Sequence, residues 1–171
     1  MDGPTALSAW IADALEHGAG RTDAILTAHA WRAGSEGDDA ALSEIAELAR
    51  ALAPSRERLA ETAQPGAAFA ETTAAAWGPS GAPAPYPVAL GAAAGAQGVP
   101  LGPTLLVALQ AFAANLVSAG IRLVPVGQTD GQRVLAGLSP LVERIAEEAG
   151  AAPLDAVGGC AFRIAIDAMT H

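Results

Sequence analysis

Residues 103–125 read PTLLVALQAFAANLVSAGIRLVP, and this apolar stretch decides the fold. Between Pro103 and Pro125 it has the roughly 20 residues that a helix needs to cross a bilayer. Four polar side chains interrupt it, namely Gln110, Asn115, Ser118 and Arg122. Because proline can open a helix and also end one, the stretch predicts a helix from Thr104 to Val124 that is buried in a helical bundle rather than in a membrane.

The rest of the sequence repeats this helical signal in shorter segments. In the first half of the chain, helices are predicted over Pro4–Glu16, from Thr22 or Asp23 to Gly34, and from Asp38 or Asp39 until Pro54. Further helices are predicted from Ser55 through a kink at Pro65 to Trp77, from Pro87 to about Gln97, and from the turn after Pro125 through Ile145 with a bend at Pro140. Gly18 and Gly20 are expected to end the first helix, and the run GPSGAPAPYP at 78–87 to form a loop. Residues 153–171 predict two short helical pieces separated by Gly158 and Gly159. The fold class is therefore all-α, a single-domain bundle of roughly seven to nine helices over residues 1–171.

Composition excludes several classes of function. The formal net charge is −9 and all nine basic residues are arginine, which argues against nucleic-acid binding and excludes a Schiff-base or P-loop lysine. The start, MDGPTALSAW, lacks the pattern of a secretory signal, and the single Cys160 fits a reducing compartment. A cytoplasmic protein is expected.

Neither a catalytic nor a metal site is predicted. Gly18 and Gly20 follow no strand and lack the third glycine of a nucleotide-binding loop. Three histidines lie far apart in the sequence, at positions 17, 29 and 171, and Cys160 has no CxxC or HxxxH companion. We therefore expect no catalytic residue, no cofactor and no metal ligand.

The segment from Arg122 to Gln132, RLVPVGQTDGQ, changes abruptly from apolar to polar. Helix-stop chemistry explains part of it, since Pro125 ends a helix, Gly127 allows a tight turn, and Thr129 or Asp130 can cap the next helix. That explanation leaves Gln128 and Gln132 without a role, although their amides suit recognition of polar groups on a partner.

At this point the sequence resembles a known family, the urease accessory proteins called UreF. The matching blocks are NLVSAGIRLVPVGQTDGQR from Asn115, LSAWIADALEHGAGRTDAILTAHAWR from Leu7, SRERLAET from Ser55, YPVALGAAAGAQGVPL from Tyr86, and the closing FRIAIDAMTH. These blocks cover nearly the whole sequence. The family usually has a glycine-rich, aromatic segment before the first block and a basic, aromatic tail after the last one, and this sequence has neither, so functions that need those ends are expected to suffer.

The resemblance implies an all-α protein that performs no chemistry alone. Such proteins join the accessory protein UreD, also called UreH, and the GTPase UreG on apo-urease, for GTP-dependent delivery of nickel, and they regulate the GTPase. Among this chain's residues, we expect the partner-binding patch on Arg122, Gln128, Thr129, Asp130, Gln132 and Arg133. A homodimer is one possibility that the sequence leaves open, since helix faces rich in alanine and glycine suit close packing.

Several alternatives stay open. Arg122, Arg133 or Arg163 could act as an arginine finger on the GTPase. The chain could be a generic scaffold, or a helical small-molecule binder with Gln110 and Asn115 directed into a pocket. His29 and His171 could bind nickel weakly. The chain could also be an enzyme that uses Cys160.

Overall fold

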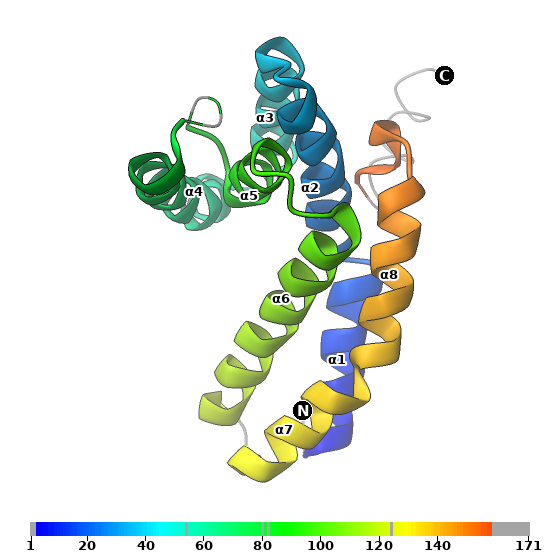
Figure 1. Ribbon diagram of the computed structural model, residues 1–171. Helices are drawn as coiled ribbons and strands as arrows, with labels where there is room; N and C mark the ends of the chain where they lie inside the picture. Colours follow the sequence, from blue (N-terminus) through cyan, green and yellow to red (C-terminus); the bar gives the residue numbers. More distant parts are fainter. Residues whose placement is uncertain (1–2, 54, 80, 82, 124, 159–171) are drawn as a thin grey trace, which may run out of the picture.

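The protein is an assembly of packed helices in the computed structural model, which describes residues 3–53, 55–79, 81, 83–123 and 125–158 (Figure 1). Within those ranges there is no strand, which confirms the all-α prediction. The elements are α1 (Pro4–Glu16), α2 (Ala19–Glu36), α3 (Asp39–Ala51), α4 (Arg56–Trp77), α5 (Tyr86–Ala96), α6 (Leu101–Leu123), α7 (Gln128–Gly137), α8 (Ser139–Ala151) and the 3-10 turn η1 (Leu154–Ala156). Three candidate functional residues lie outside these ranges, namely Cys160, Arg163 and His171. The second helical piece predicted for the tail also lies outside them.

Several predicted helix ends are confirmed, and their local chemistry explains them. The bounds of α1 are those predicted, with Pro4 in the first turn, where its missing N–H costs no hydrogen bond. Asp38 caps α3, because its side chain accepts a 2.9 Å hydrogen bond from the N–H of Ala41. At the start of α4, the carbonyl of Ser55 accepts the N–H of Leu59 at 3.0 Å. The α4 helix continues across Pro65.

The predicted start of α2, at Thr22 or Asp23, was three or four residues too late, and its predicted end, at Gly34, was two residues too early. Gly20 lies inside α2 and is buried, because the helix packs there on the backbone of Leu15, leaving no room for a Cβ. Gly34 is also helical and faces the backbone of Ala92. The residue that ends α2 is Gly37, with φ of +69°, the left-handed conformation that glycine adopts at low cost. A glycine needed for close helix packing was thus mistaken for a glycine that ends a helix.

The segment after residue 127 forms two helices where one bent helix was predicted. α7 ends at Gly137 and α8 begins at Ser139, with the buried Leu138 between them. Pro140 occupies the first turn of α8, where the absent proline N–H needs no partner. Proline therefore starts a new helix here instead of bending an existing one.

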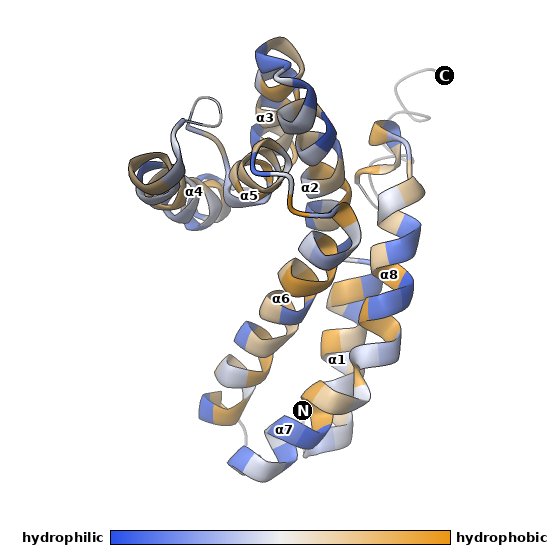
Figure 2. Ribbon diagram, in the orientation of Figure 1, coloured by the Kyte–Doolittle hydropathy of each residue, from blue (hydrophilic) through white to orange (hydrophobic). Residues whose placement is uncertain are grey.

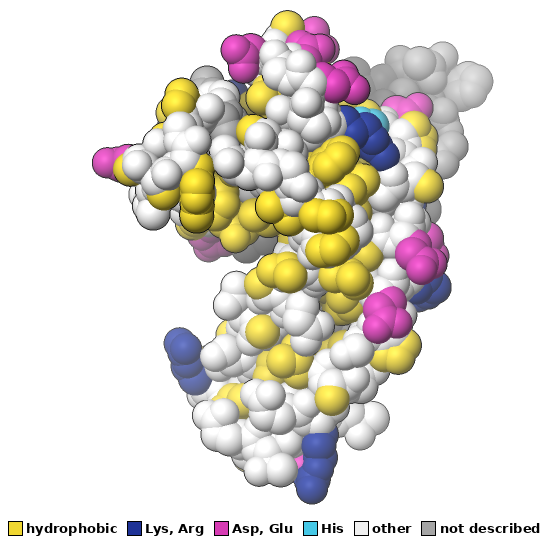
Figure 3. Space-filling view, in the orientation of Figure 1, with side chains coloured by type: hydrophobic (Ala, Val, Ile, Leu, Met, Phe, Trp, Pro, Cys, Tyr) yellow, Lys and Arg dark blue, Asp and Glu magenta, His cyan; other side chains and the backbone are white. Residues whose placement is uncertain are grey.

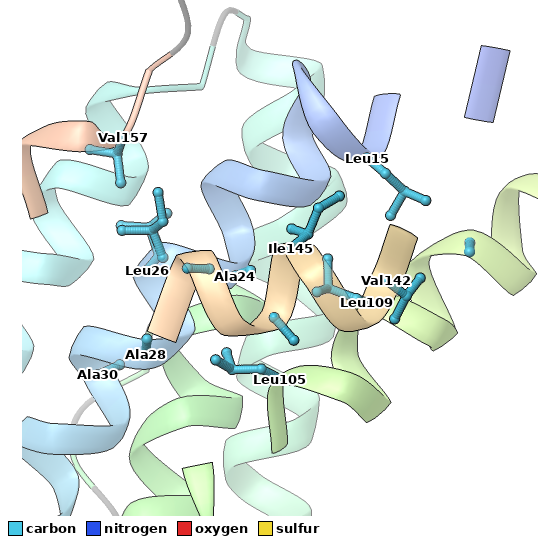
Figure 4. Packing of buried hydrophobic residues seen from close by; sticks show 14 of the residues in the cluster. Leu15, Ala24, Leu26, Ala28, Ala30, Leu105, Leu109, Val142, Ile145 and Val157 are labelled. Carbon is cyan, nitrogen blue, oxygen red and sulfur yellow. The ribbon is translucent and has the colours of Figure 1, made fainter. Parts of the chain in front are cut away.

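The core is built around one face of α6. Its buried residues are Thr104, Leu105, Leu109, Ala113, Val117 and Gly120. Figure 4 shows Leu105 and Leu109 beside Val142 and Ile145 of α8. By length and composition α6 could cross a membrane, and one third of its apolar window is buried in the bundle. The prediction of a buried helix is therefore right for one face only, and the opposite face exposes Val107.

The crossing of α2 and α5 is the most extensive helix contact in the described structure. Gly91 and Gly95 of α5 lie directly against the backbone of α2, at Thr27 and Trp31. The hydroxyl of Thr27 donates to the carbonyls of Asp23 and Pro87, at 2.8 and 3.1 Å, and so ties the two helices together. Small residues thus allow a backbone-to-backbone approach that larger side chains would prevent.

The remaining helices pack around the α6 core and the α2–α5 crossing. α4 packs on α5, where the rings of Phe69 and Tyr86 meet edge to face with centroids 5.5 Å apart. Within α4, Gly66 and Thr73 are buried, whereas Trp77 is 65% exposed. At the lower end of Figure 1, α1, α6 and α7 come together. This end carries the segment singled out in the sequence.

Candidate partner-binding surface

The segment from Arg122 to Arg133 turns the chain from the end of α6 into α7. α6 ends at Leu123, two residues before Pro125. This end is expected, because proline disfavours the helical conformation of the residue that precedes it. Val126 is only 5% exposed and belongs to the hydrophobic core. The turn is therefore anchored by one buried apolar side chain, with the exposed Leu123 and Pro125 before it and the exposed Gly127 and Gln128 after it.

Capping of α7 differs from the prediction. The N-cap is Gly127, with φ −73° and ψ 161°, and no side chain caps the helix. Thr129 and Asp130 lie within the first turn instead, where a carboxylate at Asp130 favours the positive helix end. The backbone of Gly127 is ordinary extended geometry, so the expected tight turn at this glycine was wrong. The presence of glycine at position 127 is explained by its N-cap position, because glycine is well tolerated there.

Two other glycines of this region hold the helices together, and sequence reasoning missed both. A Cβ at Gly131 would lie 2.5 Å from Cδ1 of Ile121, and one at Gly120 would lie 2.5 Å from Cδ1 of Leu7. Gly131 thus seats α7 on α6, and Gly120 seats α1 on α6. A signal was present, since both are isolated glycines within helical patterns, but such a pattern does not say what approaches them.

The predicted patch is exposed. Arg122, Gln128, Thr129, Gln132 and Arg133 are all exposed, and Asp130 is half-buried. The structure therefore brings five of the six residues onto α7 and leaves Arg122 at the end of the neighbouring α6. In Figure 2, α7 is largely hydrophilic beside the more hydrophobic α6.

Within the described part of the chain, four of these side chains form no hydrogen bond or ion pair: those of Arg122, Gln128, Thr129 and Gln132. Arg133 differs, because its Nη1 donates to Oδ1 of Asp130 at 2.8 Å. That pair is exposed, with side-chain exposures of 75% and 42%, so it contributes little to stability. Donors and acceptors without internal partners are free to meet a second protein.

A shallow groove extends the patch onto α1. Asp130, Arg133, Val134 and Gly137 form one side of it, and the other side comes from the start of α1, at Pro4, Thr5, Ser8, Ala9 and Ala12. Sequence reasoning missed the α1 side, because nothing local indicates that residues so distant in the sequence meet. The groove therefore places exposed residues of α7 beside the first turns of α1.

Charge on this surface is distributed unevenly. Figure 3 shows acidic side chains at the upper end and along the edge formed by α8, and basic side chains both in those two places and at the lower end. At that lower end Arg133 is balanced by Asp130, and Arg122 has no acidic partner among the described residues. On the edge of α8, Arg144 bridges Glu16 and Glu148, at 2.8 and 3.1 Å. The hydrogen bond from Arg144 lowers the pKa of Glu16 below its ordinary value of 4.5.

The remaining candidates lie elsewhere. Among the described residues, no three His, Cys, Asp or Glu side chains are grouped as metal ligands. Nε2 of His29 is hydrogen-bonded to the carbonyl of Ala152 at 3.0 Å, far from the patch in sequence. Asn115 lines a groove of about 300 Å³ with Tyr86 and Phe112, whereas Gln110 does not line it. The small-molecule alternative, which directs Gln110 and Asn115 into one pocket, finds no support in this groove.

The class defined by this fold is that of an all-helical protein with an exposed polar turn between α6 and α7 and, in the part of the chain that the structure describes, no group of metal ligands. A family model described as UreF matches residues 1–139. The chain belongs to the UreF family of urease accessory proteins, as the resemblance predicted.

Individual relatives agree with this assignment. The chain is 57% identical over 162 residues to a protein named urease accessory protein UreF from Cereibacter sphaeroides (strain KD131 / KCTC 12085), covering 95% of this chain and 74% of the relative. Proteins of the same name from Methylobacterium sp. (strain 4-46) and Rhodopseudomonas palustris (strain BisB18) are 48% and 46% identical. Those alignments cover 96% and 100% of this chain, and 70% and 74% of the relatives. Membership of a family of accessory proteins confirms that the chain is not itself an enzyme.

Proposed function

We propose that this chain is an adaptor that joins the accessory protein UreD (UreH) and the GTPase UreG on apo-urease, and that it regulates the GTPase during nickel delivery. An adaptor needs a rigid frame that presents polar groups to its partners. Cytoplasmic location and a homodimeric state belong to the same proposal. Exposed small residues of α6, such as Ala111 and Ala119, suit close contact with a second copy.

The observation that carries the proposal is the contrast within one short segment. Val126, Gly131 and Val134 are buried and hold the turn in place. Gln128 and Gln132 are exposed and have no partner in the part of the chain that the structure describes. These two glutamines lie one helical turn apart on α7, so they present their amides side by side. Removing them would leave the frame intact, which makes them the best probes of binding.

A complementation experiment tests the proposal. Cells that carry urease, UreD and UreG but lack their own UreF would receive this chain or its Gln128→Ala/Gln132→Ala variant. We expect the chain to restore urease activity and the double variant to restore at most about one tenth of it, as for the loss of interface residues worth about 1.4 kcal/mol. Gln64→Ala is the matched control, because Gln64 is also an exposed helical glutamine and has no partner among the described residues.

The same experiment separates this proposal from a scaffold or small-molecule binder. A chain that restores no urease activity, although it is folded and expressed, would contradict the adaptor role. Equal activity for the double variant and the Gln64→Ala control would contradict the assignment of the binding surface, even if the chain itself is active.

A further inference from the structure

Apolar side chains are exposed together where α5 passes into α6. Figure 3 shows hydrophobic side chains gathered over the middle of one face of the molecule, at the α5–α6 connection and the first turns of α6. In this part of the chain the exposed fraction is 68% for Val107, 43% for Val99 and 36% for Leu106. We call this surface the junction patch, and it consists of Val99, Pro100, Pro103, Leu106 and Val107, all of them exposed.

The backbone that carries the junction patch is held in one conformation by hydrogen bonds. Nε1 of Trp31 donates to the carbonyl of Val99 at 2.7 Å, and the N–H of Val99 donates to the carbonyl of Ala94 at 2.9 Å. The hydroxyl of Thr104 donates to the carbonyl of Pro100 at 2.9 Å. The patch therefore has a fixed shape, and a surface that is ordered before binding loses little conformational entropy when a partner covers it.

Acidic side chains of α8 border the junction patch. Gly150 of α8 lies beside α6, since a Cβ at Gly150 would be 3.5 Å from Cδ1 of Leu105. Glu147 and Glu143 precede Gly150 by three and seven residues, so they lie on the same face of α8. Both glutamates are exposed, and neither forms an ion pair within the described ranges of the chain. Figure 3 shows acidic side chains on this edge, next to the hydrophobic ones.

An apolar surface with an acidic border suits a partner with the complementary pattern. Binding would remove the apolar side chains from water, and lysine or arginine side chains of the partner would meet Glu143 and Glu147. A second copy of this chain would instead bring the same carboxylates and a further net charge of −9 to the patch. An anionic membrane surface would be repelled for the same reason.

We propose that the junction patch is a second docking surface, which binds a protein segment whose apolar face is bordered by lysine or arginine side chains. This inference rests on the adaptor role proposed above and deepens it, because a protein that joins two partners needs two surfaces. The other surface, with Gln128 and Gln132, lies past the opposite end of α6. The two are separated by about 30 Å along this helix, so two partners can be bound at once.

Binding of the purified chain to purified UreD and to purified UreG, each measured by isothermal titration calorimetry, tests this inference. Val107→Asp places a charge on the apolar part of the patch, and Glu147→Arg reverses a charge at its border. The matched controls are Ala75→Asp and Glu44→Arg, which make the same changes at exposed helical positions of α4 and α3. Circular dichroism should show equal helical content in all four variants, since each changes an exposed side chain.

We expect Val107→Asp to weaken binding to one of the two proteins at least tenfold. Glu147→Arg should weaken binding to the same protein at least threefold at low salt and by less at high salt, because salt screens the interaction between surface charges. Both controls should bind as the wild type does.

Three outcomes would overturn the inference. If the wild-type chain binds and both patch variants bind equally well, the junction patch is not a docking surface, and the adaptor role stands. If the wild-type chain binds neither protein, the adaptor role and the inference fail together. If Val107→Asp converts a wild-type dimer into a monomer in analytical ultracentrifugation, the patch belongs to a second copy of the chain.

Discussion

Replacing Gly91 by alanine should weaken the α2–α5 crossing on which the upper half of the protein is built. An added Cβ would lie 2.9 Å from Cβ of Ala30 and 3.0 Å from the backbone nitrogen of Trp31, and closer still to the carbonyl oxygen of Thr27. Backbone atoms cannot rotate out of the way, so the two helices would have to separate. Overpacking of this kind costs about 1–3 kcal/mol.

The net effect combines this cost with a small gain. Alanine is a better helix former than glycine by about 1 kcal/mol, but the contacts with backbone atoms put the packing cost at or above its usual upper limit. We therefore expect Gly91→Ala to lower the free energy of unfolding by about 2 kcal/mol. For a chain of this size the melting temperature would fall by roughly 4–8 °C.

Thermal unfolding followed by circular dichroism measures this change. Gly102→Ala is the control, because a Cβ at Gly102 of α6 would meet nothing within 4 Å. The control should melt at the wild-type temperature or slightly above it. If Gly91→Ala melts together with Gly102→Ala, the close backbone approach of α2 and α5 is wrong.

Three further predictions concern side chains with defined partners. Arg32→Ala removes a charged hydrogen bond from Nη2 to the carbonyl of Gly150. The variant should lower the free energy of unfolding, measured by denaturant titration, by about 1.5–3 kcal/mol. An unchanged unfolding midpoint would contradict the contact. Arg144→Ala should raise the pKa of Glu16 toward 4.5 in an NMR titration, and an unmoved pKa would mean that the pair does not form in solution. Because that pKa is depressed in the folded state, the pair stabilises the protein above the unfolded-state pKa, and this contribution is lost as the pH falls through the folded-state value. Arg122→Ala tests the arginine-finger alternative in single-turnover GTP hydrolysis with UreG, where a rate lowered 10³-fold or more would support it and an unchanged rate would exclude it.

Helix positions could be predicted from the sequence where the determining chemistry is local. Asp38 satisfies a backbone N–H three residues away, and Pro4 suits the first turn of any helix. Such signals involve only neighbouring residues, so a sequence displays them directly. The start of α8 had the same kind of signal in Pro140, which was misread as a bend.

Glycines were the main source of error, for a physical reason. Gly20 and Gly34 are inside α2 because another backbone lies against them, and Gly37 ends the helix through its positive φ. Close helix packing and a positive φ at a helix end both favour glycine. Only the position of the neighbouring helix distinguishes the two cases. That position depends on contacts between residues far apart in the sequence, such as Gly34 with Ala92, which periodicity cannot show.

The candidate surface was predictable in part. The polarity of Gln128 and Gln132 beside an apolar helix indicated exposed groups, and both are exposed. The roles of the surrounding residues were not evident, since Gly131 proved to be a packing position and Gly127, rather than Thr129 or Asp130, the N-cap. The participation of Thr5 and Ser8 in the adjoining groove depends wholly on tertiary structure.

The binding surface is the central claim, and the affinity of the purified chain for UreD and UreG tests it most directly. Isothermal titration calorimetry would compare the wild-type chain, Gln128→Ala/Gln132→Ala and the Gln64→Ala control, after circular dichroism has shown equal helical content. We predict that the double variant binds at least about tenfold more weakly, a loss of about 1.4 kcal/mol, while the control binds as wild type. Wild-type affinity in the double variant would contradict the claim.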